Sequence, residues 1–438
     1  MLMENVKTSE KNEVELHIFL ILVIHLPIMI PRTLLPHIEH NLRLKPVVLI
    51  TGARQTGKTT ICEKISKEHG YGYVSLADHN ERKLARDDPD MFLKVHPAPL
   101  IIDEVQYAKG LFEAIESVID KRGFETGGNE GMYILTGSQA YKLMEGVSQS
   151  MAGRVSVMNM SPLSISEIAQ REEIPFKADF QRNIERSMGL KMDVKDIYER
   201  IVRGSYPELY QKPGLKTSKF YSDYVDTYLT RDVAEIIDLK NKEKFLTFLG
   251  VAASLTGQEL VYETLCKAVG VSKPTIESWL GLLRLGGIVH LLPSYSDRSM
   301  VKGAVKRPKL YFCDTGLACY LARIHDAESL RAGYLGGPMV ETYIVNEIMK
   351  SYSNNTEDAG FYYYRDKNGN EIDLVMLRDG KLTLIECKAG TRYDSTDVKA
   401  FGKLEHSNYE IGLSCLICLT EKAYPLKDGV YALPITSI

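Results

Sequence analysis

Between residues 46 and 160, short apolar runs alternate with stretches of helical pattern. This alternation indicates buried strands joined by crossover helices, so the strands should lie parallel in one sheet. The segment is therefore expected to form an α/β domain. Its expected strands are Val47–Ile50, Tyr73–Leu76, Leu100–Ile102, Tyr133–Leu135 and Val155–Met158.

The pattern changes after residue 160. Residues 170–195 are charged and weakly periodic, which is typical of an insertion or a linker. Residues 198–239 are expected to be helical in two pieces around the tetrapeptide GSYP at 204–207. Residues 243–290 should form short helices, and from about residue 335 a helix is followed by strands.

An apolar run at residues 18–30 is too short to span a membrane and is interrupted by His25 and Pro27. The acidic residues before it do not fit a signal peptide. We favour the interpretation that residues 1–28 are an upstream extension and that natural translation begins at Met29. An interfacial membrane anchor is the second interpretation.

The bulk composition is that of an ordinary globular protein. Of the 438 residues, 44% are apolar and 25% are charged, and the net charge is −3. This balance excludes a nucleic-acid binder that acts through overall charge, although a local basic face is compatible with it. The length predicts two or three domains. Seven cysteines without regular spacing favour a reducing, cytoplasmic location, and Cys415 and Cys418 are interpreted as core residues.

The sequence ITGARQTGKTT, which follows the first expected strand, fits the phosphate-binding pattern G-x-x-x-x-G-K-[ST]. Gly52 and Gly57 allow several backbone N–H groups to point at one phosphate, and the following helix adds the positive end of its dipole. Lys58 would reach the β- and γ-phosphates, and the Thr59 hydroxyl would hold Mg²⁺. The residues expected to bind the nucleotide are Gly52, Ala53, Arg54, Gln55, Thr56, Gly57, Lys58, Thr59 and Thr60.

A second motif, PLIIDEVQ, places Asp103 and Glu104 at the end of a buried strand, 45 residues after Lys58. In a P-loop fold, such a strand delivers one carboxylate to Mg²⁺, and the next carboxylate polarises the attacking water. We therefore expect Asp103 to bind the metal together with Thr59, and Glu104 to act in ATP hydrolysis.

Ser138 or Gln139, in ILTGSQ, could sense the γ-phosphate, although a plain turn explains them equally well. Arg154 and Arg231 are candidate arginine fingers, with ordinary ion pairs as the alternative. A tyrosine stripe precedes Arg231 at helical spacing and is interpreted as core packing. Its members are Tyr221, Tyr224 and Tyr228.

Residues 259–292 have the pattern of a helix-turn-helix followed by a wing, with Ser272 capping the second helix and Pro274 in its first turn. A basic cluster in the wing region would bind DNA if it shares a face with the second helix. A winged helix used for protein contacts is the alternative. The basic residues are Arg298, Lys302, Lys306, Arg307 and Lys309.

The C-terminal segment carries a second set of acidic residues. Glu341 lies on an expected helix, Asp373 on a hairpin, and Glu386 and Lys388 alternate onto one face of the next strand. Two carboxylates, Asp373 and Glu386, could hold Mg²⁺ with help from the Cys387 carbonyl, while Lys388 stabilises a phosphate. Ordinary strand ends with a surface ion pair are the alternative.

The order of these pieces resembles a family of bacterial and archaeal AAA+-type ATPases in which a P-loop domain precedes a winged helix and a restriction-endonuclease-like domain. The resemblance covers about residues 29–438 and includes Ile30-Pro31-Arg32. The matching motifs are ITGARQTGKTT, LIIDEVQ, ILTGSQ, GSYPELY, YLTRDV, YFCDTGL, EIDLV and IECK. It implies ATP and Mg²⁺ as cofactors, and an arginine finger supplied by a neighbouring subunit, hence a possible homo-oligomer.

The expected fold is a P-loop NTPase (AAA+-like) parallel sheet, then an all-α winged helix and an α/β restriction-endonuclease-like domain. The expected boundaries are an apolar extension at 1–28, the ATPase domain at 29–195, a helical connector at 196–242, the winged helix at 243–332 and the nuclease-like domain at 333–438. The expected function is ATP-driven action on DNA, with a regulatory switch carrying an inactive nuclease-like domain as the alternative. A membrane tether is a third hypothesis that we do not favour.

Overall fold

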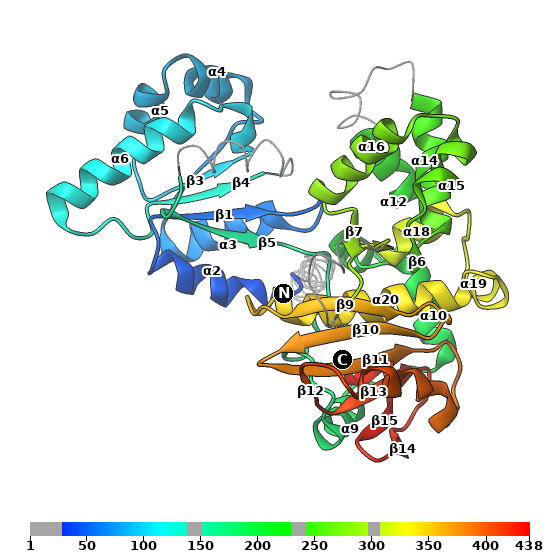
Figure 1. Cartoon of the computed structure of the whole chain (residues 1–438). Helices are drawn as coiled ribbons and strands as arrows, with labels where there is room; N and C mark the ends of the chain where they lie inside the picture. Colours follow the sequence, from blue (N-terminus) through cyan, green and yellow to red (C-terminus); the bar gives the residue numbers. More distant parts are fainter. Residues whose placement is uncertain (1–28, 138–150, 230–241, 297–306) are drawn as a thin grey trace, which may run out of the picture.

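The structure is a computed structural model that describes residues 29–137, 151–229, 242–296 and 307–438. Figure 1 shows three units along the chain: a helix-flanked sheet in blue and cyan, a mainly helical unit in green, and a second sheet in orange and red beside a long yellow helix. The first unit lies beside the other two, and the long helix α20 (Gly336–Ser353) lies between the helical unit and the second sheet.

The first unit is built on a five-stranded parallel sheet with the strand order β2-β3-β4-β1-β5. All five expected strands are confirmed, with ends shifted by no more than one residue. The strands are β1 (Val47–Thr51), β2 (Gly72–Ser75), β3 (Leu100–Asp103), β4 (Tyr133–Thr136) and β5 (Val155–Asn159).

Helices cover both faces of this sheet (Figure 1), and its central strands β1, β3 and β4 are buried along their whole length. In β1, Val47 and Leu49 face one core while Val48 and Ile50 face the other, as the two-residue period of a strand requires. The first core is closed by α4 (His79–Asp87), α5 (Pro89–Val95) and α6 (Leu111–Thr126), and the second by α2 (Leu34–Leu42) and α3 (Lys58–His69).

The second unit is not all-α, contrary to the sequence-based prediction. Its three short strands form an antiparallel sheet in the order β6-β8-β7. The run Lys309–Phe312 contains the adjacent aromatic residues Tyr311 and Phe312, which favours a strand. The strands are β6 (Gln258–Glu259), β7 (Val289–Leu292) and β8 (Lys309–Phe312).

Helices form the rest of the second unit. They are α10 (Val194–Arg203), α11 (Pro207–Gln211), α12 (Thr217–Tyr224), a π-helical turn (Val225–Leu229), α14 (Lys242–Ser254), α15 (Tyr262–Val269), α16 (Lys273–Leu285), α18 (Thr315–Leu321) and α19 (Ala327–Ala332). The predicted helices on both sides of GSYP are confirmed as far as residue 229, although the part after GSYP is divided into more than one helix; residues 230–239 of that prediction lie outside the described ranges.

The motifs GSYPELY and YFCDTGL meet at one buried carboxylate. Asp314 accepts hydrogen bonds from the Ser205 amide, the Tyr221 hydroxyl and the Leu317 amide, each at 2.7 Å. Gly204 has a positive φ of 78°, and a Cβ there would overlap the Tyr221 hydroxyl. The two motifs are therefore explained by the joining of α10, α12 and α18.

The third unit contains a mixed sheet with the order β14-β15-β13-β11-β10-β9, and β12 pairs with β11. Strands β9, β10 and β11 are antiparallel neighbours, whereas β13 runs parallel to β11 and β15. The strands are β9 (Gly360–Arg365), β10 (Glu371–Arg378), β11 (Lys381–Cys387), β12 (Glu410–Ile411), β13 (Ser414–Cys418), β14 (Tyr424–Lys427) and β15 (Val430–Pro434). Cys415 and Cys418 are buried in β13, as expected for core residues.

Residues 170–195 do not form a linker. Helix α9 (Phe180–Met188) lies against the third unit, where the Phe180 ring stacks on Tyr431 at 4.3 Å. Arg171 donates hydrogen bonds to the carbonyls of Thr436, at 2.8 Å, and Ile438. The segment looked like a linker because its apolar residues pack on a distant strand rather than along one helix.

Within the four described ranges, no helix is both long and apolar enough to cross a lipid bilayer. Residues 18–28 of the apolar run lie outside those ranges.

Candidate functional site

The loop between β1 and α3 is shaped for close contact with a phosphate. Gly52 and Gly57 have positive φ values of 131° and 96°, and a Cβ on Gly52 would lie 2.3 Å from the Met160 carbonyl oxygen. The Lys58 ammonium donates to the carbonyls of Gly52, at 3.0 Å, and Ala53, at 2.7 Å. Burial lowers the pKa of Lys58 to about 8, against the opposing attraction of Glu104 and Asp103.

The structure brings the expected metal-binding residues together. The Thr59 hydroxyl, at the start of α3, lies 3.4 Å from Asp103 Oδ2, at the end of β3. Asp103 Oδ2 also accepts a hydrogen bond from the Tyr73 hydroxyl at 2.9 Å. Burial raises the pKa of Asp103, and the Tyr73 hydrogen bond opposes that shift. A hydroxyl beside a carboxylate supplies the hard oxygen ligands that Mg²⁺ prefers, so these residues fit the ion.

A cavity of about 440 Å³ opens over this loop. Glu104, at a positive φ of 55°, lines it, and its carboxylate accepts a hydrogen bond from Gln106. Gly52 and Ala53 do not line the cavity but hold Lys58 from behind. The expected lining residues are Arg54, Gln55, Thr56, Gly57, Lys58, Thr59, Thr60, Asp103 and Glu104, and the residues that sequence reasoning missed include Arg32, Leu163, Pro207, Glu208 and Tyr228.

Arg32 supports the loop from below. Its guanidinium donates to the Thr56 carbonyl at 2.5 Å and the Ser161 carbonyl at 2.6 Å, and pairs with Glu167 at 2.9 Å. Both side chains of the ion pair are almost fully buried. The I-P-R segment carried the only sequence signal for this role, because the contacts of Arg32 lie 24 to 135 positions away in the sequence.

The tyrosine stripe divides between core and cavity. Tyr221 and Tyr224 are buried, as expected. Tyr228 instead lies at the cavity, where its hydroxyl accepts a hydrogen bond from Gln55 at 3.2 Å and the Arg54 guanidinium lies 5.3 Å from its ring centre. The second unit thus contacts the nucleotide loop directly.

The candidate arginine finger Arg154 does not line the cavity of its own chain. It pairs with Asp120 at 2.7 Å and Glu116 at 3.1 Å on the surface of α6. The other candidates for γ-phosphate contacts, Ser138, Gln139 and Arg231, lie outside the described residues.

Two acids of the third unit face each other across neighbouring strands. The antiparallel register pairs Leu374 with Ile385, so the next pair along the strands is Asp373 and Glu386. Residues directly opposite in this way point to the same face of a sheet. Asp373 Oδ2 accepts a hydrogen bond from the Cys387 amide at 2.9 Å. Cys387 thus contributes an N–H to Asp373, a contact that sequence reasoning, which invoked its carbonyl, did not foresee.

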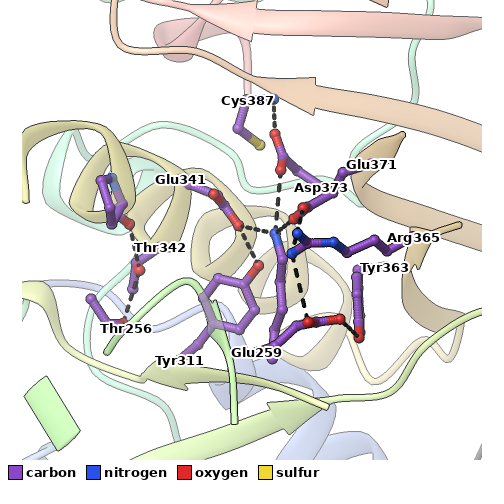
Figure 2. Close-up of polar contacts among 12 residues, drawn as sticks. Thr256, Glu259, Tyr311, Glu341, Thr342, Tyr363, Arg365, Glu371, Asp373 and Cys387 are labelled. Atoms are coloured by element: carbon purple, nitrogen blue, oxygen red, sulfur yellow. Dashed lines mark hydrogen bonds and ion pairs between the residues drawn. The ribbon is translucent and has the colours of Figure 1, made fainter. Parts of the chain in front are cut away.

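Lys309 enters this cluster from β8 of the second unit. Its ammonium lies 2.8 Å from Glu341, 2.5 Å from Glu371 and 3.3 Å from Asp373. Figure 2 shows these three acids turned toward one another, with the Tyr311 hydroxyl donating to Glu341 at 2.6 Å. The sequence analysis counted Lys309 in a basic cluster that would bind DNA if it shared a face with the second helix; Lys309 does not belong to such a face, because its side chain is 2% exposed.

The charged groups of this cluster shift one another's pKa values. Burial, with the negative charge of Asp373, raises the pKa of Glu341 to about 7 and that of Glu386 to about 8. Burial alone would lower the pKa of Lys309, but the carboxylates around it hold that pKa well above its usual value.

One oxygen of Glu386 has no partner among the described residues. Its Oε1 pairs with Lys388 at 2.5 Å, whereas its Oε2 is buried and accepts no hydrogen bond from any of them. A buried carboxylate oxygen without a donor is costly, so the site is suited to one more cation or donor. Glu341, Asp373 and Glu386 offer the oxygen ligands that Mg²⁺ prefers. Among the described residues, however, the group whose ligand atoms all lie within 4.8 Å of one another is Glu39, Glu68 and His69, so the three acids of this cluster would have to move closer together to bind one ion.

Helix α16 follows α15 after a short turn, as expected. Lys273 and Glu277 are exposed and lie 3.8 Å apart. Ser272 precedes α16, but its hydroxyl bonds to the Thr275 hydroxyl at 2.8 Å rather than capping a backbone amide. Of the expected basic cluster, Arg307 is exposed, and Arg298, Lys302 and Lys306 lie outside the described residues.

Comparisons with known families agree with this division of the chain. Residues 44–169 match a family described as an AAA domain. Together with the loop geometry, this match identifies the first unit as an AAA-type P-loop ATPase domain. Residues 194–328 match a domain of unknown function (DUF8612), and residues 336–438 match another (DUF4143).

Two uncharacterized proteins, from Mycobacterium bovis and Mycobacterium tuberculosis, are each 24% identical over 92% of this chain and 82% of their own length. Among solved structures, a Walker-type ATPase of Pyrococcus abyssi has a TM-score of 0.41 at 12% identity, covering 66% of this chain and 94% of its own. A RuvB protein of Thermotoga maritima has a TM-score of 0.29 at 15% identity, covering 58% and 88%. No function follows from likenesses this distant.

Proposed function

We propose that this protein hydrolyses ATP in its first unit and acts on DNA through a metal-dependent, nuclease-like site in its third. The observation that carries the second half is the convergence of Glu341, Asp373 and Glu386 beside Lys388. Three acids on a helix and two strands, with a lysine next to them, are what metal-assisted phosphodiester cleavage requires.

The first unit supplies the residues for hydrolysis. Lys58 lies where it can exchange the two loop carbonyls for phosphate oxygens, and Thr59 and Asp103 are placed to hold Mg²⁺, which neutralises charge on the phosphates when bound. Glu104, the next residue after Asp103, lines the same cavity and is the candidate to orient the attacking water.

Contact with DNA is assigned to the second unit. Two helices joined by a short turn, followed by the β7–β8 hairpin, have the layout of a winged helix. Lys273 at the start of α16 and Arg307 before β8 are exposed cations suited to phosphate contacts. A homo-oligomer with a finger from a neighbouring subunit stays a prediction, and Arg154 would have to leave Asp120 and Glu116 to act in it.

Two assays on the full chain test this function. ATP turnover should fall strongly in Glu104→Gln and rise when DNA is added to the wild type. Cleavage of plasmid DNA should require Mg²⁺ or Mn²⁺ and disappear in Asp373→Asn, while Asp379→Asn, at the exposed end of the β10–β11 hairpin, should cleave like the wild type. Cleavage that persists in Asp373→Asn would rule out the nuclease-like site.

A second candidate function is an ATP-dependent regulatory switch whose nuclease-like site is inactive. The observation that favours it is the Lys309 ammonium, which neutralises part of the acidic cluster. Under this function, DNA binding would respond to ATP, and no divalent metal would induce cleavage.

A further inference from the structure

We propose that Lys309 is a built-in cation that occupies the divalent-metal position of the carboxylate cluster, so that metal binds there only when this side chain leaves. The proposal rests on the proposed function, because it concerns the regulation of the same site. It assigns a role to a residue outside the third unit.

Lys309 and a divalent ion would compete for the same oxygens. The ammonium lies 2.8 Å from Glu341 Oε1 and 3.3 Å from Asp373 Oδ1. A divalent ion bound to these carboxylates would lie about 2.0–2.6 Å from their oxygens. Two cations cannot share those oxygens without strong repulsion, because like charges this close in a buried site are poorly screened.

The lysine is held in place from several sides. Besides its carboxylates, its ammonium lies 5.6 Å from the centre of the Tyr363 ring. Strand β9, which carries Tyr363, is joined to the second unit where the Tyr295 amide donates to the Tyr363 carbonyl at 2.6 Å. Lys309 is therefore part of the junction between two units rather than a surface lysine folded inward.

Glu371 contacts Lys309 but is not a proposed metal ligand, so changing it can test the lysine without removing a metal ligand. It forms the shortest contact to Lys309, at 2.5 Å, and it is not one of the three acids proposed to bind metal. We therefore assign Glu371 to holding the lysine. With Lys309 in place, Glu386 Oε2 is buried and has no partner within the described ranges of the chain, so the lysine does not satisfy the whole cluster.

The decisive experiment measures Mn²⁺ binding by titration calorimetry on the full chain without nucleotide. All variants carry Asp103→Asn, which removes a metal ligand of the ATPase site. Glu371→Gln should bind Mn²⁺ about tenfold more tightly than this parent, because it loosens the competing lysine. Lys309→Met should bind still more tightly, and adding Asp373→Asn should abolish the gain.

The sign of the Glu371→Gln effect is diagnostic. In a simple acidic cluster, removing an acid weakens cation binding. If Glu371 instead holds the competing Lys309, removing its charge loosens the lysine and strengthens Mn²⁺ binding. Glu410→Gln is the matched control, because Glu410 pairs with the exposed Lys381 at 2.9 Å and should leave Mn²⁺ affinity unchanged. If Lys309→Met fails to fold, Glu371→Gln still decides.

Three other outcomes distinguish failure of the role of Lys309 from failure of the metal site itself. If the parent binds Mn²⁺ through Asp373 and neither Glu371→Gln nor Lys309→Met binds more tightly, the role of Lys309 is disproved and the metal site stands. If no variant binds Mn²⁺, or if Asp373→Asn changes neither the affinity nor the number of bound ions, the metal site of the proposed function is disproved and this proposal with it.

Discussion

Two buried lysines, Lys58 and Lys309, sit in opposite electrostatic settings. Lys58 is held by neutral backbone carbonyls and faces a cavity of about 440 Å³. Lys309 is held by three carboxylates inside a closed junction. Accordingly, the pKa of Lys58 is lowered to about 8 by burial, whereas that of Lys309 is raised because its carboxylates outweigh burial.

The difference shows what each site is prepared to bind. A buried ammonium whose direct hydrogen-bond partners are neutral carbonyls gains most from an added anion, so the first site is suited to a triphosphate. A buried ammonium that already has its counter-charges gains nothing from an anion and blocks other cations. A buried lysine therefore favours anion binding in the first site, called the open site below, and blocks cation binding in the carboxylate cluster, called the closed site.

The largest effect is expected from Lys58→Met. Removing the ammonium that would contact the phosphates should lower ATP turnover on the order of a thousandfold, the scale found when a charge-stabilising donor is lost from an active site. Phosphate release at saturating ATP measures it. Lys64→Met is the control, because Lys64 lies on the same helix, is half-buried away from the loop and pairs only loosely with Glu68 at 3.8 Å. Equal turnover in both variants would contradict the assignment of the nucleotide site.

Arg32→Ala tests whether the phosphate loop of the open site depends on the buried ion pair between Arg32 and Glu167. The change leaves Glu167 as a buried charge without its cation, which should cost about 3–5 kcal/mol of the free energy of unfolding. It should also weaken nucleotide binding, since the Thr56 carbonyl loses its donor. Urea unfolding and nucleotide titration measure the two effects. Arg43→Ala, at an exposed helix end, serves as the control, and an equal loss in both would disprove the scaffold role.

The sequence predicted the open site better than the closed one, because the residues of the open site's phosphate loop are close together in the sequence and those of the closed site are not. The strand, loop and helix around Lys58 are consecutive, so their order alone placed the phosphate loop. Asp373 and Glu386 were also placed on one face, because strand period and a hairpin are local. Lys309 was misplaced because its face of β8 meets an acidic cluster 32 to 64 residues later in the chain. No local pattern records such a contact.

His290 lies next to the closed site and is buried against neutral side chains, so it tests the effect of burial without a nearby counter-charge. It bonds to Asn346 at 2.9 Å and stacks on Tyr311, and burial lowers its pKa from 6.5 to about 4. The unfolded chain therefore takes up the proton first, and stability falls as the pH drops from 6.5 toward 4. At pH 5.5 the loss should be about 1 kcal/mol relative to pH 7.5. Urea unfolding at both pH values should show a flatter dependence in His290→Gln than in the wild type.

The smallest effect is expected on the free energy of unfolding when a tyrosine hydroxyl is removed. Each site has one such hydroxyl that donates to a carboxylate. Tyr311 donates to Glu341 at 2.6 Å and is fully buried, whereas Tyr73 donates to Asp103 at 2.9 Å and is 38% exposed. Tyr311→Phe should lower the free energy of unfolding by about 1 kcal/mol, because no water can replace the lost donor. Tyr73→Phe should cost only a few tenths of a kcal/mol, about what is left when water takes over the hydrogen bond. Urea unfolding of both variants gives the difference directly. Equal losses would mean that the carboxylate cluster is open to water, and the contrast between the open and the closed site would then fail.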